Sequence, residues 1–288
     1  MDNIRGIAWM TLAMLGFALA DMFIKFASET LPVGQILAMF GLGGALVFGA
    51  AAKREGAILL SPVLWMRPVM IRNISEMGGT ICVVSAIALV PFSTFSAILQ
   101  ANPLLVTLGA ALFLAEPVGW RRWTAIIVGL AGVLIIIRPG FEGFDANVWF
   151  AVFGVIFMSA RDLATRPVPH SISAAQLSAY SMAAIVPGGL AVLALTGGGA
   201  IWPEPLIWGA MAGALTMGLV AYFSITKAMR VGEISAVTPF RYTRLVFALI
   251  IALVIFDERP DLWTLIGAAI VIATGLYTFA REARLRRP

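Results

Sequence analysis

Charged residues and the usual ligands of redox and metal chemistry are scarce in this chain. Only 12% of its 288 residues are charged, and it has a single cysteine, Cys82, and a single histidine, His170. A soluble protein of this length carries roughly a quarter charged residues. One Cys and one His exclude a disulfide, a Cys/His zinc site and a haem with two His ligands. We therefore expect no cofactor, no bound metal and no enzyme chemistry.

Two nucleotide-binding motifs are also missing. The sequence has no Walker loop and no dinucleotide-binding glycine fingerprint. Because a chain that hydrolyses ATP needs such a loop to hold the phosphates, ATP hydrolysis by this chain does not drive its activity.

Long hydrophobic runs are abundant instead. Hydrophobic residues make up 60% of the chain, and its mean hydropathy is +0.95. A helix needs about 20 residues to cross the hydrocarbon core of a membrane. Ten runs have suitable lengths: 5–27, 32–51, 67–90, 92–114, 120–137, 147–166, 174–196, 205–228, 233–256 and 262–280. These runs are apolar on both alternating faces, unlike membrane strands. The sequence predicts an all-α integral membrane protein with ten transmembrane helices.

Lys and Arg outside these runs are distributed unevenly. Ten spans place both termini on one side, which holds Arg5, Arg121, Arg122 and the C-terminal arginines, whereas the other side holds only Arg138 and Arg259. Positive residues favour the cytoplasmic side. We predict a multi-pass protein of the inner (plasma) membrane with both termini cytoplasmic. The basic C-terminus is interpreted as an anchor on anionic membrane lipid, not as a nucleic-acid arm.

The two halves of the chain repeat each other. Polar residues recur at an offset of 141 or 142 residues, as Asp21 and Asp162, Lys25 and Arg166, Ser93 and Ser235, and Glu116 and Glu258. Each half holds five spans, and an odd number gives the halves opposite orientations in the membrane. We predict two inverted-topology repeats, 1–142 and 143–288, in one compact membrane domain. Inverted repeats support alternating access in secondary transporters.

Particular residues resemble a known family. The stretch 228–236 (AMRVGEISA), followed by Pro239 and Glu258, resembles the second EamA repeat of the drug/metabolite transporter superfamily, and 86–91 with Asn102-Pro103 and Glu116 is a weaker first copy. The resemblance implies a ten-helix exporter with a central cavity, similar to the aromatic amino-acid and metabolite exporters. It implies export of amino acids, including aromatic and hydrophobic ones, or of related small metabolites. A flippase for a lipid-linked substrate is the alternative.

Two acid–base pairs are candidates for gating. Asp21 with Lys25, and Asp162 with Arg166, stand four residues apart, the spacing at which an acid and a base meet on one helix face. One interpretation is that each pair only neutralises itself near a span end. The other is that the pairs form gates on opposite sides of the membrane.

An amino-acid substrate needs a cation for its carboxylate, an acceptor for its amine and an apolar wall. Arg241 or Arg244 could hold the carboxylate, and the alternative is that they bind Glu76 or reach the membrane interface. Glu76 is the candidate amine acceptor or proton carrier. Neutral hydrogen-bonding partners and a cavity wall are expected from Gln100, Asn102, Trp9, Phe17, Phe95, Tyr222 and Tyr242. Packing between helices or against lipid is the alternative for each aromatic residue.

Two further features leave alternatives open. Asn102-Pro103 and Thr238-Pro239 lie inside spans, where a proline either kinks the helix or frees a carbonyl for a ligand. The pattern Gly209-x-x-x-Gly213 permits close helix packing inside one protomer or between two. The protein is expected to be a monomer or a weak homodimer.

Overall fold

The computed structural model describes residues 2–114, 119–140, 144–169, 171–197, 199–231 and 234–285. Glu116, His170 and the turn residues Gly232 and Glu233 lie outside these ranges. Every regular element within the described ranges is a helix. The prediction of an all-α protein is confirmed.

Eight of the ten predicted spans are single helices. They are α1 (Asn3–Ser28), α2 (Val33–Arg54), α3 (Arg67–Leu89), α6 (Trp120–Ile137), α7 (Val148–Thr165), α8 (Ala174–Leu195), α9 (Pro205–Val231) and α12 (Leu262–Leu285). A short 3-10 helix, η1 (Pro62–Trp65), precedes α3. Most of these helices start or end within three residues of the predicted limits, because charge, Pro and Gly interrupt the apolar runs where the helices stop.

The remaining two spans are broken helices. One consists of α4 (Phe92–Leu99) and α5 (Asn102–Phe113), and the other of α10 (Ile234–Val237), the 3-10 helix η2 (Thr238–Tyr242) and α11 (Thr243–Ile255). Pro103 stands in the first turn of α5 and Pro239 in the first turn of η2. A proline cannot donate a backbone hydrogen bond and its ring clashes with the preceding turn. Both prolines therefore interrupt the regular helical hydrogen bonding of their spans, while the backbone at Gln100, Ala101 and Val237 keeps helical dihedral angles.

Eight segments of the described chain are long and apolar enough to cross a membrane. The apolar part of α12, Leu262–Thr278, is shorter. Helix α3 is not among them, and it carries Arg67, Arg72 and Glu76. Arg72 and Glu76 have partners within the protein, as described below, so they do not have to face lipid, and Arg67 is the exposed first residue of the helix.

Contacts divide the chain into two compact units, and both units take helices from both repeats. Unit 1 comprises residues 1–23, 90–148 and 216–288, and unit 2 comprises 24–89 and 149–215. Unit 1 thus combines α4 to α6 with α10 to α12, whereas unit 2 combines α2 and α3 with α7 and α8. The helices α1 and α9 each continue from one unit into the other.

Unit 2 is held together by α2 packed on α8. Gly34 and Gly189 allow this approach, because a Cβ on either would overlap the backbone of the opposite helix. Gln35 on α2 donates to the carbonyl of Ile201 at 2.6 Å, and Gln176 on α8 donates to the carbonyl of Ile58 at 3.1 Å. The two glutamines are equivalent positions of the repeat, so these hydrogen bonds are a reciprocal exchange between the repeats.

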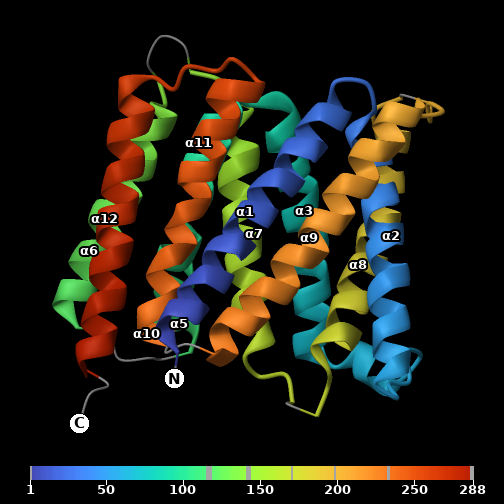
Figure 1. Cartoon of the computed structure of the whole chain (residues 1–288), viewed down its shortest axis with the longest axis horizontal. Coiled ribbons are helices and arrows are strands. Elements are labelled where there is room, and N and C mark those ends of the chain that lie inside the picture. The colour runs from blue at the N-terminus through green and yellow to red at the C-terminus, as the bar shows by residue number, and fades with distance from the viewer. Residues whose placement is uncertain are drawn as a thin grey trace. The chain divides into compact units, whose positions relative to one another are not determined.

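Unit 1 is held together by α6 beside α12, which Figure 1 shows as neighbouring helices. Gly132 and Gly267 face each other there, and a Cβ on either would come too close to the opposite backbone. A second core forms where Met10 and Met14 of α1 pack with Ala228 of α9. Ala18 of α1 also packs with Phe92 of α4 and Ala248 of α11, so α1 contacts both broken spans within unit 1.

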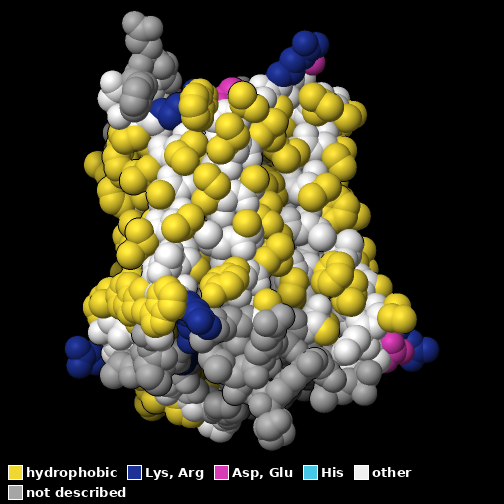
Figure 2. Space-filling view, turned by 90° about the vertical axis from the view of Figure 1, so that its left-hand side faces the viewer, with side chains coloured by type: hydrophobic (Ala, Val, Ile, Leu, Met, Phe, Trp, Pro, Cys, Tyr) yellow, Lys and Arg dark blue, Asp and Glu magenta, His cyan; other side chains and the backbone are white. Residues whose placement is uncertain are grey.

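The outer surface matches a hydrocarbon environment. Figure 2 shows a face whose middle is covered by hydrophobic side chains, with Lys, Arg, Asp and Glu only near its upper and lower ends. Ile127 and Leu134 of α6 contribute to the exposed apolar surface, being 63% and 55% exposed. An apolar surface of this extent would be unfavourable in water, so it is the surface of a membrane protein.

Candidate functional site

A buried ion pair joins α1 to α11 inside unit 1. Nη2 of Arg244 donates to Oδ2 of Asp21 at 2.5 Å. The Asp21 side chain is 11% exposed and the Arg244 side chain 18% exposed. Phe17, one turn before Asp21 on α1, has its ring centre 5.2 Å from the guanidinium carbon of Arg244. An acid, a cation and an aromatic face therefore meet at one place.

The broken span explains the position of Arg244. Because η2 ends at Tyr242 and α11 begins at Thr243, Arg244 stands where one helical segment follows the other. A buried cation is unfavourable unless an anion accompanies it. Asp21 is that anion here, and another carboxylate placed beside Arg244 would neutralise the same charge.

The two helix breaks contact each other. Gln100, which caps the end of α4, donates from Nε2 to the carbonyl oxygen of Tyr242 at 3.2 Å. Tyr242 precedes α11 and is the residue equivalent to Gln100 in the second repeat. Equivalent positions of a two-fold arrangement meet only near its axis. The contact therefore marks the pseudo-two-fold axis of unit 1, where both spans are interrupted.

Several buried hydroxyl groups near these breaks have no hydrogen-bond partner among the described residues. They belong to Ser96 on α4, Ser224 on α9 and Thr238 on η2. All three residues are at most 5% exposed. Buried polar groups are normally satisfied, so an unsatisfied one indicates an interaction with water or a ligand. Ser96 and Thr238 are again equivalent positions of the repeat.

Glu258 fixes the first half of the broken span in the first repeat. Its carboxylate accepts hydrogen bonds from the backbone N–H groups of Phe92 at 2.7 Å and Ser93 at 3.0 Å, and from the Ser93 hydroxyl at 3.1 Å. An acid at a helix N-terminus satisfies orphan donors and the helix dipole together. Glu258 therefore holds the start of α4 and with it the position of the break.

Unit 2 contains a separate polar network. Arg161 on α7 donates to both carboxylate oxygens of Glu76 at 3.2 and 3.3 Å, and to Asp162 at 2.7 Å. Four residues before Glu76 on α3, Arg72 donates to Thr165 at 3.0 Å. These contacts join α3 to α7 through charged side chains that would otherwise be costly to place inside a span.

The same network extends to α8. Arg72 donates to the carbonyl of Leu177 at 3.0 Å and to the hydroxyl of Ser181, which donates in turn to Asn73 at 3.0 Å. Arg72 thus binds two other helices. These hydrogen bonds explain how α3 can accommodate the charged side chain of Arg72 between other helices.

The structure distributes the sequence-predicted site residues over both units. Unit 1 holds Trp9, Phe17, Phe95, Gln100, Asn102, Asp21, Tyr222, Arg241, Tyr242 and Arg244, and unit 2 holds Lys25, Glu76, Asp162 and Arg166. Within unit 1, Phe95 is completely buried and Trp9 contacts Phe223 edge-on at 6.0 Å. Arg241 is exposed. Side-chain contacts bring together Asp21, Arg244 and Phe17, and separately Gln100 and Tyr242.

Three contributors were not selected from the sequence. The sequence did not indicate Arg161 as the partner of Glu76, Ser96 was not a candidate, and Thr238 was considered only for the proline that follows it. A signal for the two hydroxyl residues existed, because they are polar in both repeats at an offset of 142. The partner of Arg161 had no such signal, because Glu76 corresponds to Gly218 in the other half.

Comparison with protein families gives one match that covers both halves. The EamA-like transporter family matches residues 4–138 and again residues 146–279. The two matched segments correspond to the two repeats and leave out only the termini and the connection between the repeats.

Individual relatives are about a quarter identical to this chain along nearly their whole length. The S-adenosylmethionine uptake transporter of Rickettsia bellii is 26% identical over 97% of this chain and 94% of that protein. The riboflavin transporter of Rhizobium johnstonii is 27% identical over 98% and 93%, respectively. The pseudopaline exporter of Pseudomonas aeruginosa is 24% identical over 93% of each. The named substrates of these relatives differ from one another.

Proposed function

Because the chain belongs to the EamA-like transporter family, we propose that it carries a small zwitterionic metabolite that binds at the Asp21–Arg244 pair. Membership of the family makes the chain a membrane transporter of small metabolites and not an enzyme. The substrate class is our proposal, and the buried ion pair beside an aromatic ring is the observation that supports it.

A zwitterion can replace both halves of this ion pair at once. Its carboxylate takes the place of Asp21 on Arg244, beside the N-terminus of α11, and its ammonium group takes the place of Arg244 on Asp21. The charge inside the site is then the same before and after binding. An uncompensated charge in this buried position would cost several kcal/mol, about 3–5 for a broken pair, so an anion or a cation alone is disfavoured.

The rest of the substrate is proposed to be apolar or heteroaromatic. The ring of Phe17 lies against the guanidinium group, where a second flat group can stack or pack. Ser96 and Thr238 offer hydroxyl groups that lack a partner among the described residues. Such groups would bind the polar edge of a ring or the substrate's head group.

Relatives support an amino-acid derivative more than a neutral ring compound. One relative is named for S-adenosylmethionine, whose amino-acid end has both an amino group and a carboxylate and whose sulfonium adds a further positive charge, whereas another is named for riboflavin, which has neither an amino group nor a carboxylate of this kind. Only the first kind of compound uses both members of the Asp21–Arg244 pair. We therefore propose amino acids with aromatic or hydrophobic side chains, and amino-acid derivatives with a heteroaromatic part, as the substrate class.

The connection of α1 to both units suggests how binding is transmitted. Asp21 lies in unit 1, and Lys25, one turn further along the same helix, lies in unit 2. A substrate that releases Asp21 from Arg244 changes what holds this part of α1. We propose that Asp21 and Lys25 on one side, and Asp162 and Arg166 on the other, act as gates in alternating access. If the two gates open one after the other, the substrate can enter from one side of the membrane and leave on the other.

Proton coupling through Glu76 is a separate proposal. Glu76 is bound by Arg161 in unit 2, so we place it outside the contacts of the substrate. If a proton is carried, Glu76 must leave Arg161 during the cycle. A Glu76→Gln protein with the flux and pH dependence of the wild type would exclude this role.

Purified protein in liposomes tests the proposed function directly. Labelled S-adenosylmethionine, phenylalanine, tryptophan and riboflavin are offered with and without an imposed pH gradient, and empty liposomes provide the background. Saturable flux of phenylalanine and tryptophan, with riboflavin at background, is the expected result, and S-adenosylmethionine shows whether a zwitterionic end with an additional positive charge is also carried. Flux of riboflavin alone would contradict the zwitterion proposal.

The direction of transport and the alternative substrate class are tested in the same vesicles. We propose net export, with both termini in the cytoplasm, although the relatives include uptake transporters as well as an exporter. Vesicles sorted by protease access to the C-terminus would show which face releases substrate. If no water-soluble compound is carried by folded protein, translocation of a labelled phospholipid would favour the flippase alternative.

A further inference from the structure

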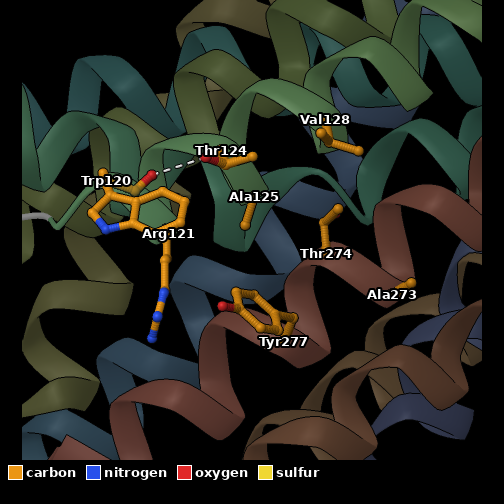
Figure 3. Close-up of a pocket in the computed structure, with 8 residues that line it drawn as sticks. All are labelled: Trp120, Arg121, Thr124, Ala125, Val128, Ala273, Thr274 and Tyr277. Carbon is orange, nitrogen blue, oxygen red and sulfur yellow. Dashed lines mark hydrogen bonds between the residues drawn. The ribbon is translucent and has the colours of Figure 1, made fainter.

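A groove of about 340 Å³ lies between α6 and α12 in unit 1. It is formed by Trp120, Arg121, Thr124 and Val128 from α6, and by Thr274 and Tyr277 from α12, with two alanines completing its wall (Figure 3). None of the proposed substrate-binding residues lines it. The groove is therefore separate from the proposed substrate-binding residues.

The wall of the groove is apolar although it contains two threonines. Thr124 donates its hydroxyl hydrogen to the carbonyl of Trp120 at 3.0 Å, a bond drawn as a dashed line in Figure 3. Thr274 donates to the carbonyl of Ile270 at 2.8 Å. Because both hydroxyls are engaged within their own helices, the wall offers a ligand mainly carbon atoms.

One end of the groove is polar and cationic. The guanidinium carbon of Arg121 lies 5.2 Å from the centre of the Trp120 ring. Figure 3 shows the Tyr277 hydroxyl and the Arg121 guanidinium group at the same end, with Val128 toward the other. Trp, Tyr and Arg at the end of a membrane span are typical of the interface between hydrocarbon and water. The polar end therefore lies at head-group depth.

The apolar end reaches into the hydrocarbon region. Val128 lies eight residues after Trp120, so it is about 12 Å further along the helix. Ile127, on the same turn, is 63% exposed on a surface covered by apolar side chains. A molecule that follows the groove must be charged at one end and apolar along the rest.

We propose that this groove binds one anionic phospholipid, with its phosphate on Arg121 and Tyr277 and an acyl chain along Thr124 and Val128. The charge of Arg121 complements the phosphate, and the apolar wall complements the chain. A water-soluble anion would pair with the Arg121 charge but would leave the apolar wall of the groove uncovered. The predicted cytoplasmic position of Arg121 places the site in the leaflet that carries anionic lipid in many membranes.

Native mass spectrometry of the full-length protein tests this site. Delipidated protein in detergent is titrated with phosphatidylglycerol, and with phosphatidylcholine for comparison. Arg121→Gln should weaken the first phosphatidylglycerol by about fivefold, the effect of about one Arg near a lipid surface, and should leave phosphatidylcholine unchanged. Arg54→Gln is the matched control, because it removes the same charge from an exposed residue at the end of α2.

A second variant tests the apolar part. Ala273 lines the groove and its side chain is exposed, so Ala273→Phe fills the groove without displacing protein atoms. It should remove one tightly bound lipid of either kind while the protein stays monodisperse. Equal weakening by Arg121→Gln and Arg54→Gln, or full lipid retention in Ala273→Phe, would overturn the proposal. So would a dimer that Ala273→Phe abolishes, since the groove would then be a contact between two copies of this chain.

Discussion

The two units differ in how they treat the polar groups that they bury. In unit 2, Glu76, Arg72, Asn73 and Ser181 form a network in which each is bound. The buried side-chain hydroxyls that lack a partner among the described residues, on Ser96, Ser224 and Thr238, all belong to unit 1. A satisfied network fixes helices in one arrangement, whereas unsatisfied groups retain the capacity to bind something else. The contrast favours unit 2 as the rigid partner and unit 1 as the site of binding.

Both units contain helices from both repeats, and each unit holds a buried charge whose equivalent position in the other repeat is neutral. Arg244 corresponds to Asn102 in the first repeat, and Glu76 corresponds to Gly218 in the second. Each substitution of a neutral residue by a charged one requires a partner nearby. Asp21 is that partner in unit 1 and Arg161 in unit 2. Only the pair in unit 1 stands at a helix break.

The largest effect is expected when the ion pair of unit 1 is separated. Asp21→Asn leaves the Arg244 charge buried without its carboxylate and should destabilise the protein by about 3–5 kcal/mol. The double variant Asp21→Asn/Arg244→Gln removes both charges and should recover most of that loss. Thermal unfolding in detergent measures the difference.

Flux separates stability from function in the same variants. The double variant should fold and still carry no zwitterionic substrate, because it has neither charge with which to hold one. A double variant that transports at the wild-type rate would show that the pair is only structural. That result would also contradict the proposal that unit 1 binds the substrate while unit 2 is the rigid partner.

A smaller effect is expected at the contact that supports the second helix break. A Cβ at Gly275 on α12 would overlap the Tyr242 hydroxyl, so Gly275→Ala should cost about 1–3 kcal/mol and lower flux by displacing Tyr242. Gly209→Ala is the matched control, because no atom lies within 4 Å of its added Cβ. Gly209→Ala should be neutral or slightly stabilising. Similar losses in both variants would contradict a specific role for Gly275.

Removing one buried polar group from each unit compares their contributions to stability and to substrate binding. Gln176→Leu removes hydrogen bonds to the Ile58 carbonyl and the Tyr180 hydroxyl in unit 2, and should destabilise the protein by about 1–2 kcal/mol without changing KM. Ser96→Ala in unit 1 removes a hydroxyl without a described partner and should leave stability unchanged or higher. Its KM for substrate should rise several-fold. The opposite pattern, in unfolding and in flux assays, would reverse the roles of the units.

The smallest effect concerns pH and an ion pair outside the spans. Burial of the Asp261 carboxyl raises its pKa, but the N–H of Thr264 and the Arg138 guanidinium group lower the pKa more, so the net pKa is below the usual 3.8. A lowered folded-state pKa stabilises the protein above the unfolded-state value, and this stabilisation is lost as the pH falls through the folded-state value.

The gain is at most about 0.5 kcal/mol, because both side chains are more than a third exposed and solvent screens them. Unfolding of Asp261→Asn and wild-type protein should therefore differ slightly at pH 7 and converge below pH 4. A difference that grows on acidification would contradict this assignment.

Much of the fold could be predicted because a membrane limits the length of its spans. The limits of α6 were predicted to the residue, since Trp120 and Arg138 bound an apolar run. The spans with Pro103 and Pro239 were predicted either to kink or to free a carbonyl for a ligand, and the structure shows an interruption of the regular helix in each span. The local sequence allows both outcomes, and packing around the break decides between them.

The partners of buried charges could not be predicted in the same way. The spacing of Asp21 and Lys25 on one helix suggests a local pair, which stays a prediction, whereas nothing in the sequence indicated that Arg244, 223 residues away, binds Asp21. A contact over that separation depends on which helices pack together. The exchange of helices between the repeats in both units was also invisible, because sequence similarity between halves does not report which helices touch.

The most direct test of substrate binding at the Asp21–Arg244 pair is whether the protein distinguishes a zwitterion from the related cation that lacks the carboxylate. Counterflow of labelled phenylalanine in proteoliposomes is measured with phenylalanine and phenylalanine methyl ester as competitors, because the ester keeps the amine and the ring but has no carboxylate. We expect the ester to compete at least about tenfold more weakly than phenylalanine in the wild type. The Arg244→Gln protein should lose this preference for phenylalanine over the ester. Equal competition by both compounds in the wild type would contradict binding at the Asp21–Arg244 pair.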